Sequence, residues 1–554
     1  MLPLKLRALL PLRLTLPPPP GILALVGAAF ILPGLAGHDL WKTQDAIALG
    51  IVHAMATSGD LVVPRLGGAP WLYDQPLYHW VALALGKLLG WAMEFHAAAR
   101  LASGLFMALA FLFLYRAARI WSAVEETSRV MACAAFLLLL GSVGLFTRAH
   151  EALPEHAALA AVALALASLA YADKRPLPAG AVFGLALGLA FLSAAWMTPA
   201  ALAVAVIAAH LACPQWRTKG GGAFLAVALV VAIVVALPWP LLLARRSADA
   251  FVAWSSIWMQ RQGPVSENLR HFFSTASWFA WPAWPLALWA VWSLRRRWRE
   301  ARLFVPALSV VAMALLFILW GPPQDENLVP LLAPLALLAA QGIFTLRRGA
   351  FAALDWFGQL TFLFATFLVW LGYVAMLTGV PGPVFRNFQR MAPGFELPFQ
   401  PHMVVLALVL AAAWLYLIVF KPSSPLRSVA RWAAGMVLLW GSIAALWMPW
   451  IDYQRSYRQV ARELSGKLPA KRGCIAQRSL GVSQAAALDY HAGIRAQPFD
   501  YLKPSACPYV LVQGNPENEK DAPLPVGRRQ WTKLADAGRP GDKNERFRLY
   551  RLER

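Results

Sequence analysis

The chain has 554 residues, of which 59% are hydrophobic and 14% are charged, and its formal net charge at pH 7 is +22. Apolar runs of roughly 16 to 25 residues recur up to about residue 450, and a soluble core cannot absorb so many runs of the length that crosses a bilayer. This pattern excludes a soluble globular protein. The basic residues are spread along the flanks of the runs, with no soluble basic helix or RNA-binding signature, which excludes a nucleic-acid-binding protein.

These runs predict about thirteen membrane spans. They lie at about 20–36, 98–116, 129–147, 156–172, 178–194, 198–213, 222–244, 274–293, 303–320, 327–345, 355–379, 402–420 and 429–450. A further apolar run at 76–93 is short and carries Lys87. We expect it to form a helix that lies along, or dips into, the outer membrane surface, and a true span with a locally broken charge bias is the alternative.

The placement of Lys and Arg predicts the orientation of the spans, because short cytoplasmic loops carry the excess of positive charge. Lys5, Arg7 and Arg13 precede the first span, so we expect a cytoplasmic N-terminus. Every second loop after that span is also basic when the run at 76–93 is left out of the count. We therefore expect a multi-pass protein of a bacterial inner membrane, with the residues after the last span in the periplasm.

The segment after the last span has many charges and no apolar run longer than a strand. Apolar residues at helical spacing from Tyr457 to Leu464 predict a helix, and SQAAALDYHAG at 483–493 predicts another. PYVLVQG at 508–514 and RFRLYRL at 546–552 are typical of strands. The predicted fold class is an α-helical polytopic membrane protein, with a transmembrane domain at 1–450 that includes a first outer loop at 37–97, followed by a small periplasmic α/β domain at 451–554.

The four cysteines fall into two groups, one in the predicted membrane part and one in the predicted outer domain. Cys133 lies within a predicted span and Cys213 at a cytoplasmic end, where both are expected to be apolar filler. Cys474 and Cys507 are the only pair in the predicted outer domain. Because an oxidising compartment favours disulfides, we expect these two residues to be bonded.

Polar and aromatic residues crowd the segment from His38 to Trp80, directly after the first span. Polar groups held at a membrane surface are costly and usually functional, so this segment predicts the mouth of an active site. Several arginines lie on the predicted outer side, against the charge rule: Arg65, Arg245, Arg246, Arg261, Arg270, Arg386 and Arg390. This placement suggests an anionic partner such as phosphate, and snorkelling or a local ion pair is the alternative for each.

Three segments carry a resemblance to a known family. They are Gln44-Asp45 followed by SGD at 58–60 and VPRLGGAPWLYDQPLYHW at 63–80, TRAHEALPEHAAL at 147–159, and ENLVPLLAPLALLAA at 326–340. Together they resemble the glycosyltransferase 39 group, which holds the lipid A aminoarabinose transferases and their bacterial relatives. The resemblance extends over the membrane part in order and topology, and its specific motifs lie in the first outer loop.

This resemblance implies a GT-C fold and a glycosyltransferase of the cell envelope. The donor it implies is a polyprenyl-phosphate-linked sugar, used on the outer face of the membrane, and the acceptor is a lipid, a glycan or a protein. Three positions depart from the family pattern. Its leading Asp falls on Gln44, its phosphate-contacting Lys on Asp74, and its second acidic residue on Glu155.

Candidate site residues follow from the chemistry of such a transfer. Phosphate is already a good leaving group, so the site must stabilise its charge and accept a proton from the incoming hydroxyl. Asp45 is predicted as the acceptor-activating carboxylate, with Glu155 assisting, and a helix N-cap or surface acid is the alternative for Asp45. The predicted substrate-binding residues are Gln44, Arg65, Asp74, Tyr78, Arg148, His150 and Arg270. For His150 a hydrogen-bonded loop histidine is the alternative, and for Tyr78 an interfacial aromatic belt.

No cofactor is predicted with certainty, and a divalent metal is not supported. Glu151 and Glu155 lie four residues apart with His150 and His156 beside them, but they match no specific ligand spacing. Two other functional classes remain open. One is a transporter or flippase for lipid-linked sugars, which would show internal repeats and ionisable residues near the membrane midplane. The other is a non-catalytic accessory protein, suggested by Gln44 and Asp74.

Overall fold

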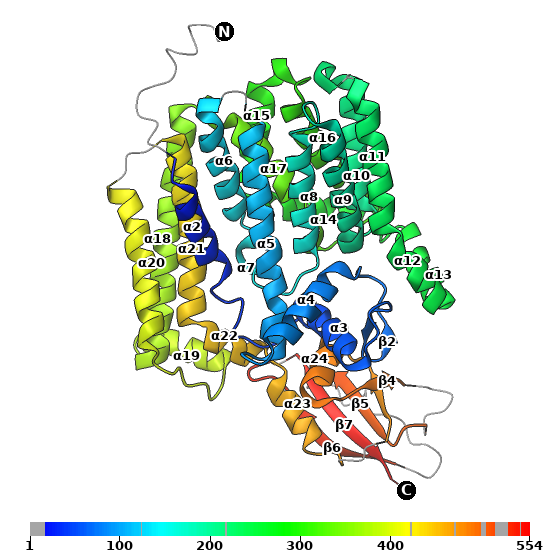
Figure 1. Ribbon diagram of the computed structural model, residues 1–554. Coiled ribbons are helices and arrows are strands. Elements are labelled where there is room, and N and C mark those ends of the chain that lie inside the picture. The colour runs from blue at the N-terminus through cyan, green and yellow to red at the C-terminus, as the bar shows by residue number, and fades with distance from the viewer. Residues whose placement is uncertain are drawn as a thin grey trace.

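The computed structural model describes residues 17–122, 125–216, 219–420, 424–469, 473–499, 506–515, 530–542 and 544–553. Lys5, Arg7 and Arg13, on which the predicted orientation depends, lie outside this described part. The chain forms a bundle of long helices with a smaller sheet domain at one end, made by the C-terminal residues (Figure 1).

Every predicted span coincides with helix in the described part of the chain. The corresponding helices are α2 (Pro20–Ile31), α5 (Phe95–Ile120), α6 (Glu125–Leu140), α8 (Glu155–Leu169), α9 (Pro176–Ala194), α10 (Met197–Ala212), α11 (Lys219–Ala236), α14 (Val265–Phe279) with α15 (Ala283–Ser293), α16 (Ala301–Leu319), α17 (Leu332–Gly342), α18 (Arg348–Thr378), α20 (Pro401–Val419) and α21 (Pro425–Leu446). Among the described residues, 7 helices are long and apolar enough to cross a membrane. The count of thirteen stays a prediction.

More than one predicted span is divided in the structure, and the break between α14 and α15 is one case. The sequence predicts a single helix at about 274–293, whereas α14 ends at Phe279 and α15 begins at Ala283. Pro282 lies in the break, and a proline has no N–H to continue the helical hydrogen bonds of the preceding turn. The apolar run is therefore divided between two helices.

Close helix packing in the bundle depends on small residues. A Cβ atom on Gly180 would lie 2.6 Å from the carbonyl oxygen of Phe224, and one on Gly184 would lie 2.3 Å from that of Ala228. Only hydrogen fits at such distances, so the backbones of α9 and α11 approach closely here. Small residues at such crossings are typical of membrane helix pairs.

The first outer loop forms its own compact layer. It contains α3 (Gln44–Ser58), a hairpin of β1 (Arg65–Leu66) and β2 (Ala69–Pro70), and α4 (Leu77–Leu89). Figure 1 shows α3 and α4 between the helical bundle and the C-terminal sheet. The apolar run at 76–93 thus forms a separate helix at the edge of the bundle.

Short helices complete the membrane part. α7 (Leu145–Arg148) and the 3-10 helix η3 (Asp325–Leu328) precede α8 and α17, and α12 (Pro238–Arg246), α13 (Ala248–Met259), α19 (Gly382–Met391) and α22 (Met448–Arg455) also lie outside the long helices. Three further 3-10 turns are η1 (Pro214–Trp216), η2 (Arg295–Arg297) and η4 (Ile343–Thr345).

The C-terminal domain is a mixed sheet with two helices, as its sequence pattern indicates. Its elements are α23 (Arg458–Ser465), β3 (Ile475–Arg478), α24 (Val482–Ala492), β4 (Ala496–Pro498), β5 (Tyr509–Gly514), β6 (Trp531–Ala537) and β7 (Arg546–Leu552). The strand order is β4-β3-β5-β7-β6, in which β3 pairs in parallel with β4 and β5, and β7 pairs antiparallel with β5 and β6. Both strands predicted from the sequence, β5 and β7, lie at its centre.

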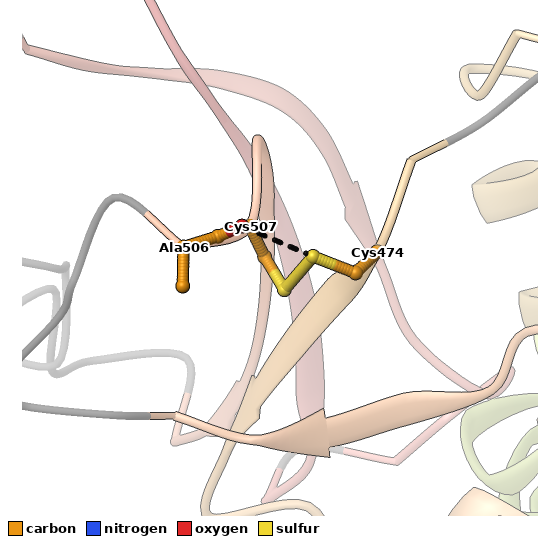
Figure 2. Close-up of a disulfide and its surroundings, with 3 residues drawn as sticks. All are labelled: Cys474, Ala506 and Cys507. Atoms are coloured by element: carbon orange, nitrogen blue, oxygen red, sulfur yellow. Dashed lines mark hydrogen bonds between the residues drawn. A yellow bond between two sulfur atoms is a disulfide. The ribbon is translucent and has the colours of Figure 1, made fainter.

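The predicted cysteine pair lies in this domain. Cys474 directly precedes β3, Cys507 lies just before β5, and the structure joins them with a disulfide (Figure 2). The bond therefore ties together the entrances of two neighbouring parallel strands.

The C-terminal domain packs directly onto the first outer loop. A Cβ atom on Gly50 of α3 would lie 2.7 Å from the Cβ of Ala486 on α24, and equally close to Cδ1 of Leu66. Since a side chain would collide there, Gly50 and Ala486 let the two helices touch. This contact joins segments that are far apart in the sequence.

Candidate functional site

Asp45 lies in the first turn of α3, and its carboxylate is fully engaged. Oδ1 accepts hydrogen bonds from Arg100 Nε at 2.8 Å and from the backbone N–H of Ala152 at 2.6 Å. Oδ2 accepts from Arg100 Nη2 at 2.8 Å and from the backbone N–H of Trp41 at 3.0 Å. Burial alone would raise the pKa of Asp45, but the Arg100 guanidinium outweighs this effect and holds the pKa below its usual range.

Arg100, the partner of Asp45, is not among the residues predicted from the sequence. It lies near the start of α5 and is fully buried. Besides Asp45, it donates to the carbonyl oxygens of His38 at 3.2 Å and Asp39 at 3.0 Å. One signal in the sequence points to it, because a charged residue within an apolar run is rare and usually has a partner.

Arg148 connects three segments at one end of the bundle. Its Nη1 lies 2.9 Å from Glu151 Oε2 and 3.1 Å from Glu326 Oε1, and its Nη2 lies 3.9 Å from Asp325 Oδ2. His271 on α14 reaches the same group, with Nε2 at 3.3 Å from Asp325 Oδ1. One guanidinium is thus surrounded by three carboxylates. Of these residues, the sequence predicted only Arg148 as a site residue.

Glu155 and Asp74 bring two more carboxyl groups to this cluster. Glu155 begins α8, and its Oε2 is buried without a hydrogen-bond partner among the described residues. Asp74, Glu326 and Arg148 are charged groups that interact with Glu155 electrostatically. Asp74 accepts a hydrogen bond from Trp71 Nε1 at 3.0 Å, and burial raises the pKa of Asp74 to about 6. Burial and the neighbouring carboxylates of Asp74 and Glu326 raise the pKa of Glu155 to about 8, so Glu155 is a largely protonated carboxyl group at neutral pH with one oxygen that has no partner among the described residues.

The loop between α7 and α8 is held from two sides. Asp45 binds the backbone of Ala152, and the Ser103 hydroxyl donates to the carbonyl oxygen of Glu151 at 2.7 Å. The Tyr78 hydroxyl lies 2.8 Å from the Ser103 oxygen, and both groups are buried. Two predicted site residues, Asp45 and Tyr78, thus fix the loop that carries the partners of Arg148.

The remaining predicted residues lie apart from this cluster. His150 is buried, with Nε2 at 2.7 Å from the carbonyl oxygen of Phe30 and its ring stacked on Trp440, and burial lowers its pKa to about 4. Gln44 is half-buried at the start of α3. Arg65 lies 4.0 Å from Asp60, and Arg270 is exposed on α14 next to His271.

No group of three or more His, Cys, Asp or Glu side chains in the described part of the chain is arranged to hold a metal ion. The chemistry that this arrangement can provide is acid-base and electrostatic. It combines a half-buried guanidinium, several carboxyl groups and one carboxyl oxygen without a partner.

No protein-family model matches the chain, but individual proteins of known name are similar to it in sequence. The undecaprenyl phosphate-alpha-4-amino-4-deoxy-L-arabinose arabinosyl transferase of Pseudomonas paraeruginosa is 28% identical over 441 residues, which cover 77% of this chain and 74% of that protein. The arabinosyl transferase 1 of Sodalis glossinidius is 30% identical over 338 residues, or 58% of each chain.

A solved structure shows the same fold. The crystal structure of ArnT from Cupriavidus metallidurans, bound to undecaprenyl phosphate, matches with a TM-score of 0.67 at 17% identity and covers 96% of both chains. The resemblance seen in the first outer loop is thereby confirmed over most of the chain. The chain is a membrane glycosyltransferase with the GT-C fold, homologous to the undecaprenyl phosphate-aminoarabinose arabinosyl transferases.

Proposed function

We propose that the chain transfers a sugar from a polyprenyl-phosphate-linked donor to a lipid, glycan or protein acceptor on the outer face of the membrane. The observation that carries this proposal is the Arg148 cluster, where the first outer loop, the α7–α8 loop and η3 meet. The names of the relatives support the donor class, since they describe transfer from undecaprenyl phosphate. The matching structure holds undecaprenyl phosphate itself.

Glu155 is our candidate for the carboxylate that accepts the proton of the acceptor hydroxyl. Burial raises the pKa of Glu155 to about 8, so its ionised form is the minor form at neutral pH and a stronger base than an ordinary carboxylate. Its Oε2 has no hydrogen-bond partner in the described structure, whereas both oxygens of Asp45 are occupied by N–H donors. A general base needs a free lone pair within reach of the substrate, and a lowered pKa makes a carboxylate a weaker base. The sequence favours Asp45 for this step. The four hydrogen bonds of Asp45 favour a positioning role instead, in which it holds the loop that precedes Glu155.

Arg270 is our candidate for binding the donor phosphate. It is exposed and follows Leu269 on α14, next to the His271 that contacts Asp325. The guanidinium of Arg148 is already surrounded by carboxylates, so a further phosphate would meet repulsion there. Arg65 is a second candidate because its side chain is partly exposed and makes only two long contacts, with Asp60 at 4.0 Å and with the carbonyl oxygen of Gly68 at 3.5 Å. An arginine suits this role because its planar fork donates two parallel hydrogen bonds to phosphate.

The other predicted residues keep supporting roles in this proposal. Gln44 and Asp74 lie in the first outer loop where the acceptor would enter, and Tyr78 fixes the Ser103 hydroxyl. His150 is part of the α7–α8 loop and ties it to the carbonyl oxygen of Phe30. The proposed setting is a bacterial inner membrane with a cytoplasmic N-terminus. In it, a transmembrane domain at 1–450 is followed by a periplasmic domain at 451–554.

A transfer assay with purified protein and a polyprenyl-phosphate-linked sugar tests this function. Glu155→Gln should lower turnover by roughly 10² to 10⁴ and leave the binding of polyprenyl phosphate intact. Arg270→Ala should weaken donor binding, because its contact exists in the ground state as well as in the transition state. If Glu155→Gln transferred normally while a folded Asp45→Asn protein did not, the proton-accepting role would move to Asp45. Absence of transfer by the wild type with every lipid-linked sugar supplied would reject the function.

A further inference from the structure

A cleft of about 480 Å³ opens between the first outer loop and the C-terminal domain. Three parts of the chain line it: α3, the start of α5, and the helices α23 and α24. The lining residues are His53, Ala56, Glu94, Phe95, Arg458, Tyr490 and His491. The volume falls within the range of small-molecule binding sites, roughly 300 to 1,000 Å³. None of these residues belongs to the Arg148 cluster.

The charged groups at the cleft are paired with one another within the protein. Arg458 lies in its wall, with Nε at 2.9 Å from Asp39 Oδ2 and Nη2 at 2.6 Å from Glu94 Oε2. Its guanidinium is therefore shared by two carboxylates and has no surplus charge for a phosphate. His491, also in the wall, has Nε2 at 2.9 Å from the other oxygen of Asp39. An anionic ligand is disfavoured by this arrangement.

The polar groups that remain available are neutral. The imidazole of His53 has no hydrogen-bond partner among the described residues, and burial lowers its pKa, so it is uncharged at neutral pH. An uncharged imidazole offers one donor and one acceptor. The Tyr490 ring lies 5.1 Å from the His53 ring, and the Tyr490 hydroxyl is 3.0 Å from His96 Nδ1. Phe95 adds an apolar aromatic surface beside them.

Such a lining matches the chemistry of a sugar. A saccharide presents hydroxyl groups that both donate and accept hydrogen bonds, and its ring faces carry C–H groups that pack on aromatic side chains. We propose that the cleft binds an uncharged saccharide segment of the acceptor. This inference rests on the proposed function, because it assigns the second substrate of the same transfer.

The cleft is connected to the proposed reaction site by a continuous set of contacts. Arg458 and His491 hold Asp39, the carbonyl oxygen of Asp39 accepts from Arg100, and Arg100 holds Asp45. Asp45 in turn binds Ala152, next to the Glu151 that contacts Arg148. A ligand held in the cleft is therefore positioned by the same framework as the proposed reaction site.

Binding of free neutral trisaccharides to the full-length protein in nanodiscs tests this inference. The probes are chitotriose, maltotriose and mannotriose, and calorimetry or saturation-transfer NMR measures binding without donor. We expect saturable binding of at least one probe. Ala56→Trp should abolish it by filling the cleft, and His53→Ala should weaken it roughly tenfold. His402→Ala, an exposed histidine on α20, is the matched control and should bind as the wild type does.

Several outcomes would overturn the inference. They are no saturable binding of any of the three probes, unchanged binding in both cleft variants, or tighter binding of N-acetylglucosamine 1-phosphate than of the neutral sugars. Thermal unfolding shows whether the Ala56→Trp protein folds. If it does not, saccharide binding to the His53→Ala protein alone tests the inference. In the transfer assay, His53→Ala should raise the KM for the acceptor and leave kcat unchanged. Transfer without cleft binding would reject this inference alone, whereas cleft binding without transfer would reject the proposed function alone.

Discussion

Arg100 and Asp45 form a buried two-pronged ion pair, with Nε to Oδ1 and Nη2 to Oδ2 both at 2.8 Å. Asp45 is 1% exposed and Arg100 is 0% exposed. A buried ion pair contributes little net stability compared with apolar residues, but loss of one partner leaves an uncompensated charge. The pair therefore makes the first outer loop depend on a residue of the long helix α5.

Asp45→Asn should destabilise the protein by about 3 to 5 kcal/mol, because it leaves the Arg100 guanidinium buried without its counter-charge. The new amide group would also face N–H donors, either of Trp41 or of Ala152. Thermal unfolding of the purified protein measures this loss. A matched double variant, Asp45→Asn with Arg100→Met, should recover part of it. An Asp45→Asn protein with unchanged thermal stability and lost transfer would instead assign Asp45 a direct chemical role.

Asp74 should make stability depend on pH between about 4 and 6, since burial raises its pKa from 3.8 to about 6. Below this window the carboxyl is protonated in both folded and unfolded protein. As the pH rises through it, the unfolded chain ionises first, so the folded state loses stability. Asp74→Asn keeps an acceptor for Trp71 and removes this titration. The variant should gain on the order of 3 kcal/mol over the wild type at pH 7 and almost nothing at pH 4.

Thermal unfolding of both proteins across this pH range decides the matter. If the two proteins kept a constant difference in stability from pH 4 to pH 7, Asp74 would not be the titrating group.

The Cys474–Cys507 disulfide should stabilise the C-terminal domain by about 3 to 4 kcal/mol, because it closes a loop with a sequence separation of 33 residues. Replacement of both cysteines by serine should lower the unfolding temperature of this domain. A reducing agent should lower the wild type to the same value and leave the double variant unchanged. Mass spectrometry of non-reduced peptides checks the bond directly, and two alkylatable thiols in protein from an oxidising compartment would contradict it.

The apolar helices were predictable because their signal is local. A run of apolar residues specifies its own helix through the cost of unpaired backbone groups in lipid. The break between α14 and α15 also has a local cause, which is Pro282. A hydropathy profile misses this break because it is an average over many residues. Strands β3 and β4 contain only 4 and 3 residues, too few for a pattern of alternation. β3 takes its structure from pairing with β5, and β4 from pairing with β3, and neither pairing can be read from a short segment.

The site was only partly predictable because its contacts are long-range. Asp45 and Arg100 are separated by 55 residues, and no spacing rule links them. Glu326 was part of a recognised motif, yet its contact with Arg148 depends on how η3 folds back toward α7. The sequence identified the loops that carry charged groups. Only the packing of these loops shows which carboxylate is paired. Asp45 is fully hydrogen-bonded, whereas Glu155 keeps an oxygen without a partner among the described residues.

The contact between α3 and α24 should fail if Gly50 gains a large side chain. Gly50→Leu places atoms where Ala486 and Leu66 already lie, because even a Cβ would approach both to 2.7 Å. The C-terminal domain should then become more sensitive to protease than in the wild type. Gly222→Leu is the matched control, since a Cβ there meets nothing within 4 Å and the residue lies on the helix α11. Equal protease resistance in the two variants would show that Gly50 is not required for docking.

Reporter fusions test the proposed orientation, which depends on the placement of Lys and Arg. Fusions after Arg119, Arg175, Arg302 and Lys421 should report the cytoplasm, because these residues lie in or beside the basic loops. Fusions after Ser247, Gly382 and Gly473 should report the outer face. Gly473 is the decisive position, since it lies in the C-terminal domain that contacts the first outer loop. A cytoplasmic signal there would place that loop, and the Arg148 cluster with it, on the inner side, where a donor displayed in the outer leaflet cannot reach.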